Sequence, residues 1–365
     1  MIAATPVVLN VGLVGYGFAG RVFHAPVIRA VEGLRLTTIV RRHGTPDPPY
    51  PGVEVVPSVN ELLTRAIDLV VVATPNPSHH PIAKQCLLAG RHVVVDKPFT
   101  TTVAEAEELL RLGKQQRRVI SAYQNRRYIG DFVTLRQLLS EGALGPVRIF
   151  ESHFDRYRPE LRPGAWREQP QPGSGVWFDL GSHLLDQALL LFGVPEAVSA
   201  DIRVEREGAT ADDAFDVMLH YPHSRALLRA SMLAVSPGPT FAVHGTKGSF
   251  IKHGIDPQEE ALKSGHTPDE SHWDSEPVEM YGTLTTPEGT RTVPTIPSSF
   301  TQYYENIRDA ILGKAQPAVP PEQVLNVMRG LELAAVSSQQ RRVLPWGGEG
   351  ATGATVGNRR APSIS

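Results

Sequence analysis

Three side chains in this sequence are suited to moving a proton: Lys97, Asp179 and His183. Lys97 directly follows the apolar run HVVVD, so its amine is expected at the end of a buried strand. Asp179 and His183 are four residues apart in a segment with helical periodicity, which places them on one face, with Asp186 a further turn along. An imidazole beside a carboxylate suits abstraction of a proton from an alcohol. The alternatives are a solvated lysine at a strand end and an ion pair on a solvated helix face.

The element that must organise this chemistry is the segment 7–42, VVLNVGLVGYGFAGRVFHAPVIRAVEGLRLTTIVRR. Its pattern predicts a buried strand, a glycine turn, a helix and a second strand. In that context Gly15 permits the tight turn, Gly17 lets the backbone approach a pyrophosphate, and Gly20 lets the helix pack on the strand. The segment therefore predicts a dinucleotide-binding site. A glycine-rich turn without a ligand is the alternative.

The residue type at the end of the second strand indicates whether the dinucleotide is NAD or NADP. A preference for NAD usually comes with Asp or Glu about 20 residues after the glycines, where the carboxylate binds the ribose 2′-hydroxyl. Here that place is taken by Arg41, with Arg42 beside it. Because a guanidinium suits a 2′-phosphate, the pair predicts NADP, with NAD also possible. Solvated loop arginines are the alternative.

The first 125 residues alternate strand and helix patterns. This alternation predicts a Rossmann domain over residues 1–125, with a doubly wound parallel sheet. Strands are expected near 53–56, 68–73, 92–96 and 119–122, and helices near 58–66, 80–89 and 102–116.

The pattern changes after residue 125. Residues 126–346 predict a C-terminal α+β domain with a large, mostly antiparallel sheet, to which the family resemblance described below assigns substrate binding and oligomer contacts. The expected helices are 131–140, 175–192, 300–312 and 322–339, and the expected strands are 147–154, 197–204, 214–221, 225–233 and 240–251. Residues 253–297 predict a long polar excursion, and 347–365 a disordered tail.

Composition narrows the classes of function. The chain has 365 residues, 41% hydrophobic residues and a net charge of −2, which argues against nucleic-acid or membrane-surface binding. Its single cysteine, Cys86, allows no internal disulfide and predicts a small core residue in a reducing cytoplasm. No secretory signal and no membrane span are evident, so a cytoplasmic protein is expected. No metal site is expected, since no third ligand stands at a suitable spacing.

Further polar residues stand where they can reach a substrate. His153, Asp155 and Tyr157 alternate on one strand, facing either a cleft or solvent. A second group, Tyr123, Asn125 and Arg126, lies where the chain leaves the first domain. The residues expected to bind substrate are Tyr123, Asn125, Arg126, His153, Asp155 and, as a weaker candidate that can equally pack in the core, Tyr303.

Several motifs together resemble one family. VGYGFAGRVFHAP, TPNPSHH, VVVDKPFT, YQNRR, ESHFDRYRP, WREQ and SGVWFDLGSHLLDQALLLFG occur in the order found in the Gfo/Idh/MocA oxidoreductases. Within that family they resemble most the NADP-dependent scyllo-inositol dehydrogenases. The family's Glu-Lys-Pro motif is here Asp96-Lys97-Pro98, with a shorter carboxylate, and the resemblance implies a cis bond before Pro98.

The resemblance implies a hydride transfer between nicotinamide and a cyclic polyol or sugar, with Lys97, Asp179 and His183 as the catalytic residues. It implies a homodimer or homotetramer that pairs through the open face of the second sheet, while the composition argues for no nucleic-acid and no membrane partner. The residues implied to contact the cofactor are Gly15, Gly17, Phe18, Ala19, Arg41, Arg42, Thr74, Pro75, Asn76, His79, Asp96 and Lys97.

Other activities within the family stay open. One is a reductase acting on a different sugar, an anhydrosugar or a dihydrodiol. A second is a glycosidase that holds and recycles its dinucleotide. The third is a regulator that binds the dinucleotide without turnover, although the presence of Lys97, Asp179 and His183 favours an enzyme.

Overall fold

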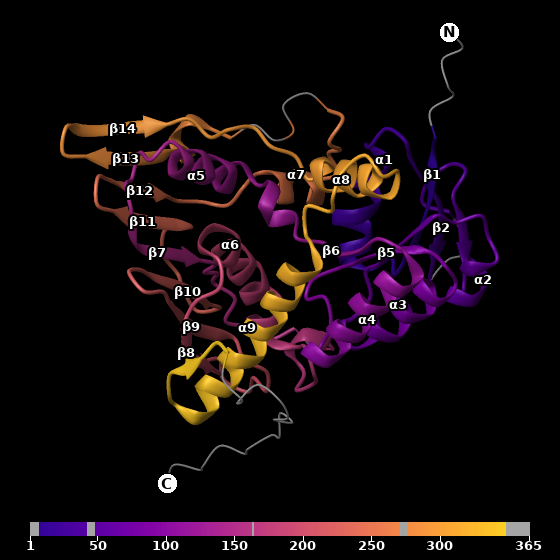
Figure 1. Cartoon of the computed structure of the whole chain (residues 1–365), viewed down its shortest axis with the longest axis horizontal. Helices are drawn as coiled ribbons and strands as arrows, with labels where there is room; N and C mark the ends of the chain where they lie inside the picture. Colours follow the sequence, from indigo (N-terminus) through magenta and orange to yellow (C-terminus); the bar gives the residue numbers. More distant parts are fainter. Residues whose placement is uncertain (1–6, 42–47, 163, 271–272, 274–275, 348–365) are drawn as a thin grey trace.

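A computed structural model describes residues 7–41, 48–162, 164–270, 273 and 276–347. Two sheets form its two halves, one on the right and one on the left of Figure 1. The cofactor prediction for Arg42 and the disorder predicted after residue 347 fall outside the described residues.

The first sheet has six strands in the order β3-β2-β1-β4-β5-β6. All adjacent pairs are parallel, which confirms the Rossmann prediction. Its strands are nearly continuous runs of Val, Ile and Leu because helices cover both faces. The strands are β1 Leu9–Val14, β2 Leu34–Val40, β3 Glu54–Val56, β4 Leu69–Val72, β5 His92–Val95 and β6 Ile120–Ala122.

The helices of this half begin at capping residues that the sequence predicts. The hydroxyls of Ser58 and Thr102 accept the backbone N–H of Glu61 and Glu105, respectively, at 3.2 Å in both cases. Cys86 is buried, as expected. The helical segments are η1 Gly20–His24, α1 Ala25–Arg29, α2 Val59–Leu63, η2 Asn76–Ser78, α3 His79–Leu88, α4 Val103–Gln116 and η3 Asn125–Tyr128.

The second sheet has nine strands in the order β14-β13-β12-β11-β7-β10-β9-β8-β15. Every pair is antiparallel except β7 with β10, so the predicted mostly antiparallel sheet is confirmed. The strands are β7 Val147–His153, β8 Ala197–Arg203, β9 Ala214–His220, β10 Arg225–Ser231, β11 Phe241–Gly245, β12 Ser249–Lys252, β13 Gly282–Thr286, β14 Gly289–Val293 and β15 Leu344–Pro345.

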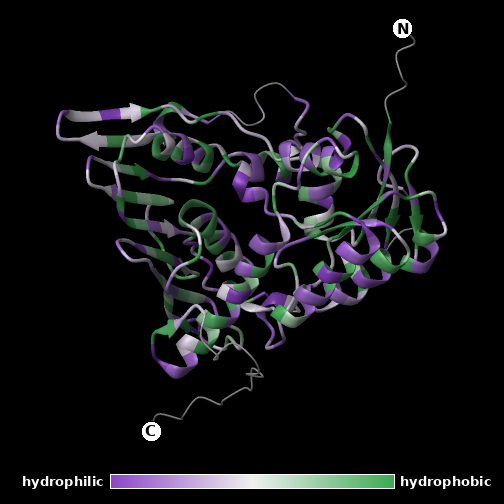
Figure 2. Ribbon diagram, in the orientation of Figure 1, coloured by the Kyte–Doolittle hydropathy of each residue, from purple (hydrophilic) through white to green (hydrophobic). Residues whose placement is uncertain are grey.

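Two expectations for this half are wrong. The strand expected over 240–251 is a hairpin of β11 and β12. The polar stretch 253–297 is not an excursion without regular structure, because it contains a helix and the β13–β14 hairpin. In Figure 2 the outer part of that hairpin is pale to purple, so it lacks the apolar alternation that would reveal a strand.

The helices of the second half lie between the sheets and on the second sheet. The longest, α9, contacts β8 of the second sheet as well as α4 and β6 of the first half. The carboxylate of Glu332 on α9 accepts the N–H of Val103 at 2.7 Å, which joins it to the start of α4. The helical segments are α5 Gly130–Ser140, η4 Trp166–Glu168, η5 Trp177–Gly181, α6 Ser182–Phe192, α7 Gln258–Lys263, η6 Val278–Met280, α8 Thr301–Ile311 and α9 Pro321–Gln340.

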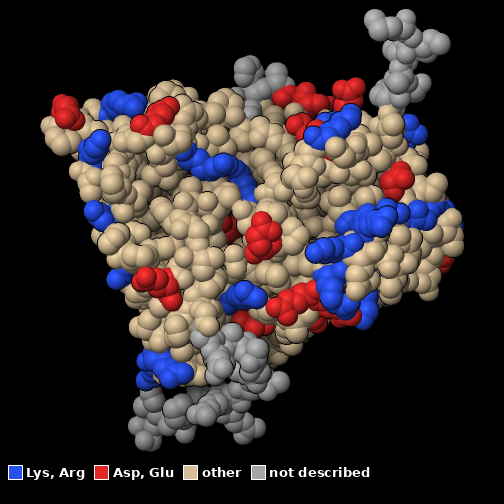
Figure 3. All heavy atoms as spheres, viewed as in Figure 1, with Lys and Arg blue, Asp and Glu red and all other residues tan. Residues whose placement is uncertain are grey.

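The surface carries both signs of charge. On the face shown in Figure 3, Lys and Arg are interspersed with Asp and Glu. Among the described residues, no helix combines the length and the apolar character needed to cross a bilayer.

Candidate active site

Lys97 and Asp179 come together although they are far apart in the chain. The Lys97 Nζ donates to Asp179 Oδ1 at 2.7 Å and to the Asp179 carbonyl oxygen at 2.9 Å. Arg167 adds a second cation, with its Nε 3.3 Å from the same Oδ1. The side chains of Lys97 and Asp179 keep 14% and 25% of their surface exposed. The pair therefore stands at an accessible edge rather than in the core.

The charges around this pair fix protonation states. Burial alone would raise the pKa of Asp179, but the positive charges of Lys97 and Arg167 outweigh it and hold that pKa below its ordinary value. The pKa of His183 is well below its usual range, because burial and then Lys97 and Arg126 disfavour the imidazolium. At neutral pH, Asp179 is thus an anion and His183 a neutral ring.

Asp179 and His183 do not pair with one another in the way that four-residue spacing suggests. Asp179 lies in η5, a π-helical turn that widens the spacing before α6 begins. His183 is 5% exposed, and its Nδ1 is buried with no hydrogen-bond partner among the described residues. The prediction that both lie on a polar helix face is therefore corrected. His183 is a buried ring with a free nitrogen.

Hydrogen bonds from buried side chains fix the loop that carries Lys97. The peptide bond before Pro98 is cis, as the resemblance implies. The Oδ1 of Asp96 accepts the N–H of Lys97 at 2.8 Å. The His79 ring nitrogens lie 3.0 Å from the Pro98 carbonyl oxygen and 2.8 Å from that of Thr74. His79 and Asp96 are both buried, so they brace this loop from inside rather than project toward a ligand.

The helix that carries Asp179 is fixed at its start. The Asp212 carboxylate accepts the N–H of Trp177 at 2.6 Å, and the Trp177 indole donates to the Leu331 carbonyl of α9 at 3.0 Å. Asn76, at the end of the first sheet, donates its amide to the Gly173 carbonyl at 2.6 Å. The bond between Asn76 and Gly173 connects the two halves beside the candidate site.

The glycine turn has the shape that a pyrophosphate needs. A side chain at Gly15 would collide with the Ala73 carbonyl oxygen, and one at Gly20 with the Gly15 carbonyl oxygen. These two glycines serve the fold. At Gly17, by contrast, a β-carbon would meet nothing within 4 Å, and Gly17 and Phe18 are exposed. The turn therefore leaves open room in front of the start of η1, as a bound dinucleotide requires.

Other residues expected to contact the cofactor flank this turn. Arg41 directly follows β2, and its guanidinium carbon lies 4.9 Å from the centre of the Tyr16 ring. The Ser78 hydroxyl donates to the Thr74 hydroxyl at 2.7 Å, which orders the turn after β4. At the same edge of the sheet, Ala19 and Thr74 are half-buried and Pro75 is exposed.

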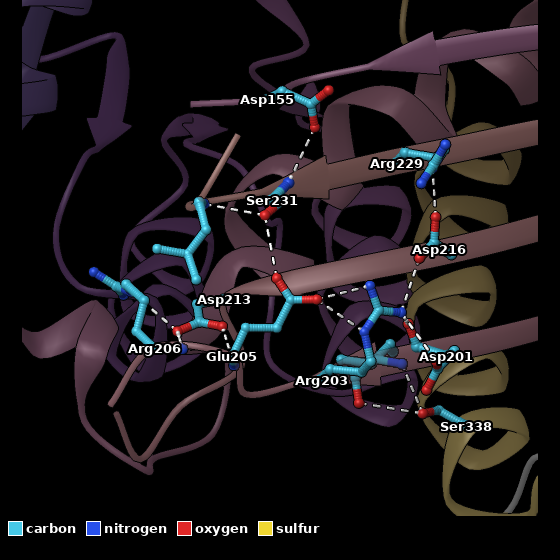
Figure 4. A network of polar contacts seen from close by, with 12 residues as sticks. Asp155, Asp201, Arg203, Glu205, Arg206, Asp213, Asp216, Arg229, Ser231 and Ser338 are labelled. Carbon is cyan, nitrogen blue, oxygen red and sulfur yellow. Dashed lines mark hydrogen bonds and ion pairs between the residues drawn. The ribbon is translucent and has the colours of Figure 1, made fainter. Parts of the chain in front are cut away.

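Arg126, His153 and Asp155 line one cavity of about 340 Å³ in the second half. Arg126 donates to Glu259 at 2.7 Å. Asp155 accepts the N–H of Ser231 at 3.2 Å (Figure 4), and its Oδ2 lies 3.5 Å from the His153 Nδ1. Asn125 is buried in η3.

Tyr123 and Tyr303 do not stand on a cleft wall. Each is 1% exposed, and their ring centroids lie 4.9 Å apart in an aromatic cluster with His24 and Tyr304. The Tyr123 hydroxyl donates to the Phe23 carbonyl at 3.0 Å. The substrate contacts expected for them are corrected to core packing, the alternative already open for Tyr303. Tyr157 is 57% exposed.

Sequence reasoning missed three carboxylates and a cation of this region. Arg167 belongs to the WREQ motif and could have been weighed from it. Asp212, Glu259 and Asp256 stand in segments without periodic pattern, so only the folded chain reveals them. Within the described ranges, no three His, Cys, Asp or Glu side chains are grouped so that they could hold a metal ion.

Comparisons with known proteins bear on this geometry. Residues 9–124 match the NAD-binding Rossmann fold of the Gfo/Idh/MocA oxidoreductase family, and residues 136–346 match its C-terminal alpha/beta domain. The chain belongs to the Gfo/Idh/MocA family.

Relatives of this Gfo/Idh/MocA protein match over nearly their whole length. It is 45% identical to the uncharacterized oxidoreductase YdgJ of Escherichia coli, over 92% of this chain and 98% of YdgJ. It is 38% identical to IolW of Bacillus subtilis, a scyllo-inositol 2-dehydrogenase (NADP(+)), over 92% and 95%. The solved structure of yvaA from Bacillus subtilis superposes with a TM-score of 0.88 at 36% identity, over 94% and 99%. This protein is thus an oxidoreductase with a nicotinamide-cofactor fold.

Proposed function

We propose that this protein is an NADP-dependent dehydrogenase that oxidises a secondary alcohol of a cyclic polyol or sugar, or reduces the matching ketone. The observation that carries the proposal is the contact of Lys97 with Asp179 beside a neutral, buried His183. The name of the relative IolW, a scyllo-inositol dehydrogenase that uses NADP(+), supports the substrate class.

Each residue has a separate part in this proposal. The neutral His183 accepts the proton of the substrate hydroxyl, because an unprotonated imidazole nitrogen can act as a general base. Lys97 donates a hydrogen bond to the same oxygen and so favours the developing alkoxide. Asp179 holds the Lys97 amine at 2.7 Å and sets its direction. When bound, the nicotinamide supplies the acceptor for the hydride that leaves the substrate carbon.

Arg41 supports the choice of NADP. The position after β2 faces the ribose of a dinucleotide in a Rossmann fold, and a carboxylate there would repel a 2′-phosphate. Arg41 occupies it, and a guanidinium can bind that phosphate in a bidentate manner. The pyrophosphate would lie at Gly17 and the nicotinamide ribose near Thr74.

The test is the initial rate of dinucleotide reduction with scyllo-inositol, myo-inositol and a set of aldoses, measured in parallel with NADP+ and NAD+. The proposal predicts turnover of at least one polyol and a preference for NADP+ of about tenfold or more in kcat/KM. Tight NADPH binding without turnover on any polyol, sugar or matching ketone would contradict it and favour a dinucleotide-sensing regulator.

A further inference from the structure

A buried histidine connects the glycine turn with the loop that carries Lys97. His24 is the last residue of η1, the π-helical segment that begins at Gly20 directly after that turn, and its side chain is fully buried. Its Nε2 lies 3.7 Å from Oδ1 of Asp96, the residue before Lys97. The proposed reaction gives His24 no part, so the position of this titratable ring needs a separate explanation.

Two tyrosines hold the His24 ring in one orientation. The ring centroid of Tyr123 lies 4.3 Å from that of His24, and the Tyr304 hydroxyl lies 2.6 Å from Nδ1. Burial raises the pKa of Tyr304 well above its ordinary value, so its phenol keeps its proton and can donate a hydrogen bond to Nδ1. Because Tyr304 belongs to α8, this bond joins the second half of the molecule to the first.

The same contacts determine which ring nitrogen of His24 carries a proton. An imidazole that accepts a hydrogen bond at Nδ1 carries its hydrogen on Nε2, and an imidazolium carries one there as well. The other tautomer would set a lone pair against the Asp96 carboxylate. Nε2 is buried and forms no hydrogen bond within the described ranges, so Asp96 is the acceptor that the structure places beside it. At 3.7 Å the contact is electrostatic, and the absence of water around buried groups strengthens it.

Asp96 extends this contact to the backbone of Lys97. Its Oδ1, the atom nearest to His24, accepts the N–H of Lys97 at 2.8 Å, and only 7% of Asp96 is exposed. Burial alone would raise the pKa of Asp96, but His24, and then the charges of Lys97 and His79, hold that pKa below its ordinary value. Asp96 is therefore an anion, and an ionised carboxylate accepts a backbone N–H more strongly than a neutral one.

We infer that His24 is a positioning residue, whose Nε2–H fixes the Asp96 carboxylate and thereby the backbone from which the Lys97 amine reaches Asp179. The inference rests on the proposed function, because only that function gives Lys97 a part in a reaction. The alternative is a purely structural ring that stabilises the contact of α8 with the first half. In that case the bond to Tyr304 would matter and the contact with Asp96 would not.

Two amide variants separate these roles, because each retains a polar group near one of the two ring nitrogens. The longer side chain in His24→Gln can place its amide where Nε2 lies, which keeps a donor beside Asp96 and loses the bond to Tyr304. The shorter side chain in His24→Asn reaches only as far as Nδ1, which keeps a partner for Tyr304 and loses the donor beside Asp96.

The variants are assayed as the full chain with NADP+ and whichever polyol the wild-type enzyme oxidises. In His24→Asn, kcat should fall about 10- to 100-fold while the KM for the polyol changes less than about threefold, because a displaced Lys97 amine weakens a contact of the transition state. His24→Gln should keep kcat within about fivefold of wild type. The control His266→Asn, which removes an exposed histidine 2.7 Å from Glu270, should change neither constant. Equal losses of kcat in both His24 variants, or the larger loss in His24→Gln, would overturn the inference.

Tyr304→Phe provides the test if the His24 variants do not fold, since it removes one hydroxyl and keeps the ring packing. Without its partner at Nδ1 the His24 ring loses its fixed orientation, so kcat should fall about three- to fivefold. An unchanged kcat in this variant would overturn the inference.

A second measurement does not depend on turnover. In hydrogen exchange of the full chain with NADPH, followed by mass spectrometry, the Lys97 amide should exchange about tenfold faster in His24→Asn than in wild type or His24→Gln. This result together with no turnover of any polyol, sugar or matching ketone by wild type would refute the proposed function and leave the contact of His24 with Asp96 supported. Turnover by wild type with unaltered kcat and unaltered Lys97 exchange in His24→Asn would refute the inference alone. Neither turnover nor a change in exchange would refute both.

Discussion

Two carboxylates on one helical segment meet two cations from the first half of the molecule, and the two pairs differ in their surroundings. Asp179 meets Lys97, which follows β5, and both side chains keep part of their surface. Asp186 meets Arg127, which follows β6, in a pair whose side chains are 3% and 4% exposed. Sequence spacing puts Asp179, His183 and Asp186 into one polar group, but the structure separates them.

Geometry shows why the two pairs serve different ends. Arg127 binds both oxygens of Asp186 at 2.6 and 2.7 Å and donates at 2.8 Å to the Ala318 carbonyl and to Gln323. That guanidinium has little capacity left for a ligand. The Lys97 amine donates two of its three N–H groups to Asp179, and the third stays available. Saturated, buried charges stabilise an arrangement, whereas an incompletely bonded and accessible charge can act on a substrate.

The largest loss of stability is expected for Arg127→Met, which breaks the buried pair of this comparison. Removal of the guanidinium leaves Asp186 buried without its cation, which should lower the free energy of unfolding by about 3–5 kcal/mol. Urea unfolding of the variant and wild type would measure the change. The activity that remains in the folded fraction should keep its KM, since Arg127 does not face the candidate site.

Matched variants control for this effect. Lys97→Met should lower the free energy of unfolding by about 1 kcal/mol or less, because the pair that it breaks is partly exposed. The double variant Arg127→Met with Asp186→Leu should regain much of the stability, because no unpaired charge stays buried. Equal losses of stability in Lys97→Met and Arg127→Met would break the comparison.

Asp131 supplies a third case, a buried carboxyl group that forms no ion pair and whose effect on stability depends on pH. Burial and Asp256, followed by the opposing Lys252 and then Glu276 and Arg126, leave its pKa raised to about 7. The folded protein keeps this proton up to about pH 7, whereas the unfolded chain releases it near pH 4. The folded state therefore binds more protons in that window, and stability falls as the pH rises from about 4 to 7.

Asp131→Asn removes this titration. The variant should be more stable than wild type at pH 8 by about 4 kcal/mol, and the difference should vanish toward pH 4. Unfolding by urea at a series of pH values would measure it. A constant difference between the two proteins across the series would contradict the raised pKa.

The first sheet could be predicted closely because its strands carry their own signal. Runs such as LVVV over 69–72 are buried on both faces, and glycines or capping residues mark the turns between them. The second sheet carries a weaker signal. In β14 only Val293 is buried, so nothing in GTRTV distinguishes a strand from a polar loop. Its pairing with β13 depends on a hairpin that only the folded chain reveals.

The candidate site likewise contains residues that the sequence can place and residues that only the folded chain places. Lys97 could be placed from sequence because the end of a parallel strand has a fixed location in a doubly wound sheet. The relation of Asp179 to His183 could not, because it depends on the π-helical turn Trp177–Gly181. The pairing of Arg127 with Asp186 also escapes spacing arguments, since the two residues are 59 positions apart.

The most direct test of the central claim measures NADPH binding and turnover of Lys97→Met side by side with wild type, using whichever polyol the wild-type enzyme oxidises. The account predicts that kcat falls about 10³-fold while the Kd for NADPH changes less than about threefold, because Lys97 acts on the reacting oxygen. Lys84→Met, which removes a surface lysine paired with Glu108, is the matched control. Retained turnover in Lys97→Met, or parallel losses of turnover and NADPH binding, would contradict the account.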